Sequence, residues 1–101
     1  MRILISCANG SGTSLMMMRS TEKAMKELNI PITKIHHCSI SEGKSSATQY
    51  DVVFTPVNFL GMFDQAIKKG VTVVGIKNVM SHKEIGEKFT ETNLYERIKT
   101  K

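Results

Sequence analysis

The sequence has no tryptophan, and its 101 residues include only four phenylalanines and two tyrosines. A protein that stacks on nucleic-acid bases needs aromatic side chains on a basic face. The net charge of +5 comes from lysines and arginines that are spread along the chain and do not alternate with aromatics. We therefore expect no nucleic-acid partner, and the positive charge instead favours acidic or phosphorylated partners.

Long apolar runs and cysteines are also scarce. The longest uninterrupted apolar run has about four residues, whereas a helix needs roughly 20 to cross a bilayer. Cys7 and Cys38 could form a disulfide, but a domain of this size buries roughly 60–65% of its unfolded surface and folds without one. We expect no secretory signal. We expect a soluble, cytoplasmic protein with reduced thiols, in which residues 1–101 form a single domain.

Four runs have the composition of β-strands, namely residues 2–6, 32–39, 51–55 and 71–76. The first, third and fourth are nearly continuous in apolar residues, which is typical of strands covered on both faces of a parallel sheet. The second run is more polar, so we place it at an edge of the sheet.

Helical patterns separate these runs. Residues 14–28 carry apolar residues at helical spacing, at Met17, Thr21, Ala24 and Leu28, with Met18 and Met25 beside them. Residues 59–69 predict a second helix that Gly70 ends. Its inward-facing side chains are predicted to be Leu60, Phe63, Ala66 and Ile67. The spacing of Ser81 and Glu84 is typical of a capping box and opens a third helix, with a break near residues 92–93. Residues 41–50 are too polar for a core element and predict a loop or a short exposed helix.

This alternation predicts an α/β fold: a small three-layer sandwich whose four-stranded parallel sheet has the order 2-1-3-4 and carries helices on both faces. In that order the chain reverses direction beside the first strand. Ligands of open α/β sheets bind above the carboxyl ends of the strands at such a switch point. Cys7 ends the first strand and therefore stands at the predicted site.

Small residues follow Cys7 and lead into the first helix, as they do in several anion-binding motifs. The P-loop of nucleotide hydrolases requires a lysine after its last glycine, and Gly12 is followed by Thr13. The dinucleotide fingerprint requires a third glycine, and Leu15 stands in its place. A cysteine-dependent phosphatase of low molecular weight carries an arginine where this chain has Thr13, and that arginine clamps the phosphoryl oxygens.

The segment from Cys7 to Met18, CANGSGTSLMMM, resembles the active-site segment of the IIB components of the bacterial phosphoenolpyruvate-dependent sugar phosphotransferase system (PTS). Residues 39–45 and 73–81 are similar to the ascorbate-type IIB subunits, within the lactose, ascorbate and galactitol group. The resemblance covers nearly the whole chain.

The resemblance implies a phosphotransferase that needs neither cofactor nor metal. Phosphohistidine on the EIIA partner would phosphorylate Cys7, and the phosphocysteine would phosphorylate a carbohydrate such as ascorbate at the membrane-embedded EIIC permease. The protein would thus lie at the inner membrane through the permease. The residues that match the phosphate-binding loop of the family are Asn9, Gly10, Ser11, Gly12, Thr13 and Ser14. Ala8 and Thr13 replace the glycine and serine that relatives often have, which leaves the substrate class open.

Physical reasoning assigns Cys7 the role of nucleophile. Backbone N–H groups at the following helix would lower the pKa of its thiol and then bind the phosphoryl oxygens. Three alternatives stay open: a phosphatase-like enzyme, a non-catalytic anion-binding module, and an inert buried thiol.

Other residues that could carry chemistry are assigned plainer roles. We expect Cys38 to be structural. His36 and His37 point to opposite faces of a strand and do not readily bind one metal together. Met16 should face solvent near the loop, where it would suit docking, and residues 55–58 should lie beside the Cys7 loop.

Overall fold

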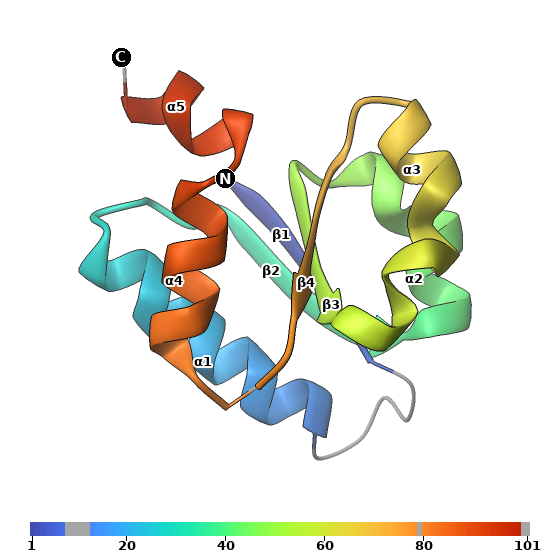
Figure 1. The fold of residues 1–101 in the computed structure, drawn as a ribbon, viewed down its shortest axis with the longest axis horizontal. Coiled ribbons are helices and arrows are strands. Elements are labelled where there is room, and N and C mark those ends of the chain that lie inside the picture. Colours follow the sequence, from blue (N-terminus) through green and yellow to red (C-terminus); the bar gives the residue numbers. More distant parts are fainter. Residues whose placement is uncertain (8–12, 79, 100–101) are drawn as a thin grey trace.

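The computed structural model describes residues 1–7, 13–78 and 80–99. Strands and helices alternate along the chain (Figure 1). In order they are β1 (Arg2–Cys7), α1 (Thr13–Glu27), β2 (Lys34–Ser39), α2 (Ile40–Ser46), the 3₁₀ helix η1 (Ala47–Gln49), β3 (Val52–Pro56), the 3₁₀ helix η2 (Val57–Phe63), α3 (Asp64–Lys68), β4 (Thr72–Ile76), α4 (His82–Thr90) and α5 (Asn93–Lys99).

The four strands form one parallel sheet in the order β2-β1-β3-β4, which confirms the predicted topology. Helices α1 and α4 cover one face, and α2 and α3 cover the other (Figure 1). Strand β2 lies at an edge, as its polar composition predicted. The chain reverses direction beside β1, so Cys7 ends a central strand at the switch point.

Alternation along the strands divides the apolar interior into two cores. Ile3, Ile5 and Cys7 of β1 face α1 and α4, together with Phe54 of β3. Leu4 lies in the other core. The central strands are thus covered by apolar side chains on both sides, which is why their runs in the sequence are so continuously apolar.

Helix α1 confirms the predicted amphipathic face, since Met17, Thr21, Ala24 and Met25 are buried. The second predicted helix differs from the structure. Residues 57–63 form the 3₁₀ helix η2, and only residues 64–68 form α3. Helix α3 ends at Lys68, and Gly70, the predicted stop, lies two residues further on with a φ of 96°. A 3₁₀ segment turns once in about three residues, so it changes the phase of the residues that follow. Ile67, predicted to point inward, is 46% exposed.

The polar segment after β2 forms a short and mostly exposed helix, which was one of the two predicted outcomes. The expectation that the segment is too polar to belong to the core is wrong, because Gly43, Ala47 and Tyr50 are buried. Ser39 caps α2 by accepting a hydrogen bond from the backbone N–H of Glu42 at 3.4 Å. Gly43 is buried, and a Cβ there would overlap Ser6 Oγ and lie 2.8 Å from Ser6 Cβ. Because glycine lacks a side chain, a polar helix can pack directly on β1.

The third predicted helix is confirmed in its start and its break. Ser81 Oγ accepts a hydrogen bond from the N–H of Glu84 at 3.2 Å, α4 ends at Thr90, and α5 begins at Asn93. The Glu84 carboxylate does not return to the cap. Its two oxygens accept hydrogen bonds from the backbone N–H groups of Lys77 at 2.6 Å and Asn78 at 3.0 Å, and so hold the turn after β4 in place.

Candidate functional site

Cys7 is the last residue of β1 and pairs in register with Ser39 of β2. Helix α1 begins at Thr13, so the carboxyl end of a central strand leads within a few residues into a helix of 15 residues. The predicted phosphate-binding residues Asn9, Gly10, Ser11 and Gly12 lie outside the described residues. Thr13 and Ser14 form the first turn of α1, and their side chains also lie outside the description.

The Cys7 side chain is buried in the core beneath α1. It is 1% exposed, and its thiol donates a hydrogen bond to Met17 Sδ at 3.6 Å. Burial, and to a smaller extent the charge of Cys38, raises the pKa of Cys7 to about 11. The prediction that the helix lowers this pKa is therefore wrong for the structure described. Contact with hydrocarbon and a thioether removes the water that would stabilise a thiolate.

Cys38 lies on the other face of the sheet. It pairs in register with Ser6, the neighbour of Cys7, and belongs to the core beside α2. The two thiols point away from each other across the sheet, which prevents an intramolecular disulfide. Burial raises the pKa of Cys38, the Ser6 hydroxyl lowers it, and the Glu42 charge raises it. Its 6% exposure agrees with the predicted structural role.

Exposed apolar side chains gather at the end of the molecule that carries Cys7. Leu15 and Met16 lie in the first turns of α1, Val57 directly follows β3, and Met80 follows β4. Met16 is 43% exposed, which confirms its predicted position in solvent. Because parallel strands end at the same edge of the sheet, these residues form an apolar rim at the carboxyl edge.

Thr55 does not face Cys7. Phe54 shares the Cys7 face, so strand alternation turns Thr55 to the other side of the sheet. Its side chain is completely buried, and its Oγ1 has no hydrogen-bond partner among the described residues. The segment from residue 55 to 58 thus splits, with a buried Thr55 and with Val57 and Asn58 exposed.

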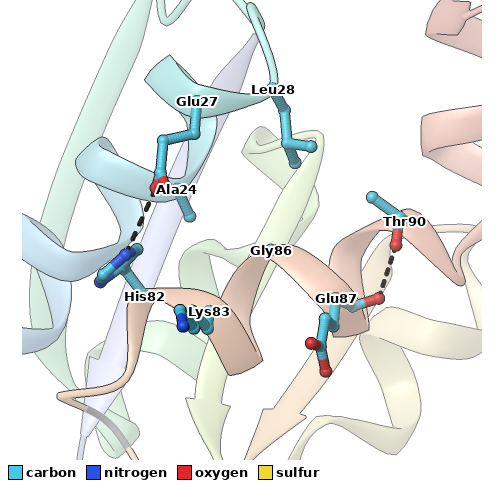
Figure 2. Close-up of a pocket in the computed structure, with 8 residues that line it drawn as sticks. All are labelled: Ala24, Glu27, Leu28, His82, Lys83, Gly86, Glu87 and Thr90. Carbon is cyan, nitrogen blue, oxygen red and sulfur yellow. Dashed lines mark hydrogen bonds and ion pairs between the residues drawn. The ribbon is translucent and has the colours of Figure 1, made fainter.

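A separate pocket of about 240 Å³ lies between the second half of α1 and α4 (Figure 2). His82 Nε2 and Glu27 Oε2 lie 3.3 Å apart across it. Ala24, Leu28 and Gly86 contribute its apolar lining. The lining comes from the half of α1 remote from Cys7, so the pocket is no part of the predicted site.

A family model described as "PTS system, Lactose/Cellobiose specific IIB subunit" matches residues 2–91. The chain belongs to this IIB family. Curated relatives named "Ascorbate-specific PTS system EIIB component", from Salmonella typhimurium and Escherichia coli O157:H7, are 29% identical over 90 residues and cover 89% of this IIB chain and 86% of the relative. A lactose-specific IIB component domain from Streptococcus pneumoniae has a TM-score of 0.61 at 13% identity, and the match covers 99% of this chain and 95% of that one. At that identity the likeness shows the fold alone.

Membership confirms the resemblance seen in the sequence and makes this protein a IIB component of a sugar transport system. Among its described residues, no helix combines the length and the apolar character that crossing a membrane requires.

Sequence reasoning missed two contacts around the site. Helical spacing predicted that Met17 is buried but not that it contacts Cys7. Glu84 was assigned to the predicted capping box, so its contact with the turn after β4 was not predicted.

Proposed function

We propose that this IIB chain carries a phosphoryl group on Cys7, from phosphohistidine of an EIIA protein to a carbohydrate at an EIIC permease. The observation that carries the proposal is the position of Cys7, at the carboxyl end of a central strand and at the switch point of the sheet. Ligands of open α/β sheets bind at this place. Family membership supplies the phosphotransfer chemistry that a lone thiol would not identify.

The first transfer uses a protonated thiol. With a pKa of about 11, Cys7 carries its proton at neutral pH. As the S–P bond forms, the P–N bond of phosphohistidine breaks, and the thiol proton passes to the imidazole nitrogen that leaves. In the second transfer a carbohydrate hydroxyl oxygen attacks phosphorus and the S–P bond breaks. The sulfur then takes up the proton that the hydroxyl gives up.

Backbone N–H groups at the start of α1 would bind the phosphoryl oxygens, because the first turn of a helix has N–H groups without intrahelical partners. In the proposal Asn9, Gly10, Ser11, Gly12, Thr13 and Ser14 complete this binding loop. Cys7 is only 1% exposed, so the donor reaches its sulfur after the side chain leaves Met17.

Ascorbate is the carbohydrate that we propose. The relatives that cover 89% of this chain are named for ascorbate, whereas the structure named for lactose is only 13% identical. The apolar rim of Leu15, Met16, Val57 and Met80 lies at the carboxyl edge of the sheet, where Cys7 ends β1. In the proposal it docks EIIA and EIIC in turn, and residues 1–101 act as a single cytoplasmic domain beside the inner membrane.

Intact-mass spectrometry tests the carrier proposal. The chain is incubated with phosphoenolpyruvate, the general phosphotransfer proteins and the ascorbate-type EIIA. We expect one added phosphoryl group on the wild type and on the matched control C38S, and none on C7S. A phosphoryl group retained by C7S, or absent from the wild type, contradicts the proposal.

The same preparations separate the two other classes. A phosphatase would release phenolate from an aryl phosphate with steady turnover, which we expect to be negligible because Thr13 replaces the arginine clamp. An anion-binding module would bind inorganic phosphate and gain no covalent mass.

A further inference from the structure

Three side chains with different metal-binding atoms come together on the sheet face opposite Cys7. One ligand atom from each of His36, Cys38 and Glu42 lies within 4.8 Å of the other two. His36 and Cys38 stand two residues apart on β2 and therefore point to the same face. Glu42 comes from the first turn of α2, which Ser39 positions by capping the helix.

We propose that His36, Cys38 and Glu42 form a Zn²⁺-binding site. Zinc accepts imidazole nitrogen, thiolate sulfur and carboxylate oxygen in a tetrahedral arrangement, and three protein ligands leave a fourth position for water. Bond lengths of roughly 2.0–2.3 Å place the ligand atoms of such a site roughly 3.3–3.6 Å apart. His36 and Glu42 are exposed, so there is room around their side chains to close the remaining distance to the buried Cys38. The His36 ring also stacks on the His37 ring, with the ring centres 6.2 Å apart, and this contact has to adjust as the site closes.

The charges of the site suit a divalent cation. Binding releases the Cys38 proton to solvent, because the zinc ligand is the thiolate. The thiolate and the Glu42 carboxylate then balance the two positive charges of zinc. A neighbouring cation acts against binding: the Lys34 ammonium lies 5.3 Å from the centre of the Tyr50 ring, beside the same groove.

Access to the site is open. A groove of about 510 Å³ runs along α2, and its lining includes His36, Glu42, Ser46 and Tyr50. The groove supplies both an entry path and room for the water that would complete the coordination. Zinc held here would join the edge strand β2 to α2, on the face opposite the proposed phosphorylation site.

No metal was expected from the sequence because His36 was paired with His37, and strand alternation places these two side chains on opposite faces of the sheet. The proposed site pairs His36 with Cys38 instead. Glu42 joins the pair only because α2 folds back beside β2, which no local pattern shows.

Titration with Co²⁺ tests the site, since a cobalt–thiolate bond gives a charge-transfer absorption that oxygen and nitrogen ligands alone do not. We expect this absorption in the wild type and in C7S, which lacks the other thiol, and its displacement by Zn²⁺. C38S should lose it. H36Q and E42Q should bind Co²⁺ at least about tenfold more weakly, since loss of even an outer contact to a ligand costs about 10–100-fold in affinity. H37Q is the matched control and should bind like the wild type.

Stability gives a second readout that does not depend on absorption. Zn²⁺ should raise the melting temperature of the wild type and of H37Q but not of C38S. The His36 and Glu42 side chains are exposed, so their variants test the site without changing a core residue. Cobalt absorption that C38S retains, or that the wild type lacks at millimolar Co²⁺, overturns the proposal, and neither result bears on phosphorylation of Cys7.

Discussion

Alkylation of Cys7 by iodoacetamide should be slow at neutral pH and should rise about tenfold per pH unit until the pH approaches the pKa of the thiol. Burial moves that pKa from 9.0 to about 11. Two pKa units correspond to about 3 kcal/mol against the thiolate. At pH 7 the thiolate fraction is therefore about 10⁻⁴, compared with about 10⁻² for a thiol of pKa 9.0.

Variants separate the two causes of this shift. M17A removes the side chain that covers the sulfur, so it should lower the pKa of Cys7 toward 9.0 and raise the alkylation rate at neutral pH. M17L keeps the burial and should leave the pKa raised, as a matched control. C38S removes only the smaller cause and should lower the pKa of Cys7 less than M17A does.

The assay follows the peptide that contains Cys7 by mass spectrometry, which separates it from the peptide that contains Cys38. A wild-type rate that levels off below about pH 8 would refute the reasoning, because it would show a thiolate stabilised in spite of burial. Stability provides an independent check. Above pH 9 the unfolded chain loses the Cys7 proton while the native state keeps it, so the free energy of unfolding should fall until about pH 11, and less in C7S.

Three further predictions concern the frame around the site, each read from thermal or denaturant unfolding. G43A should destabilise the protein by about 1–3 kcal/mol, because the new methyl group overlaps Ser6 and overpacks the interface. G86A makes only ordinary van der Waals contacts and should stabilise the protein by roughly 0.5–1 kcal/mol. Equal effects of the two variants would contradict the packing argument. E84A leaves two backbone N–H groups without their acceptor and should cost about 1–2 kcal/mol, more than the control E87A on the same helix. The hydrogen bond from the Arg2 backbone N–H lowers the pKa of Asp51. The ionised Asp51 side chain should therefore stabilise the folded state at neutral pH, and this stabilisation should be lost as acid protonates the carboxylate in the native state. In D51N the free energy of unfolding should fall less steeply with acid.

Local patterns were sufficient for the topology and for the position of Cys7 in it. Continuous apolar strands that alternate with amphipathic helices admit few arrangements, because parallel crossovers are right-handed and both faces of the sheet must be covered. The position of Cys7 at the switch point followed from the end of its strand. The start of α4 followed from Ser81, since a capping hydrogen bond joins residues that are close in sequence.

Patterns failed where the phase of one segment depends on another. Ile67 was placed inward by assuming one continuous helix from residue 59, and the 3₁₀ turns of η2 changed that phase. The polarity of residues 41–46 hid a buried contact, because a glycine contributes nothing to an apolar pattern and Gly43 packs closely by having no side chain.

The sequence by itself determined the sheet order, the helix that follows Cys7 and the family, because each depends on the order and spacing of neighbouring residues. Only the tertiary structure decided whether the Cys7 thiol is ionised, since that depends on the Met17 side chain that covers it across ten positions of chain. It likewise brought Glu42 to His36 and Cys38. Burial and electrostatic interactions act through space, and packing between elements sets the distances on which they depend.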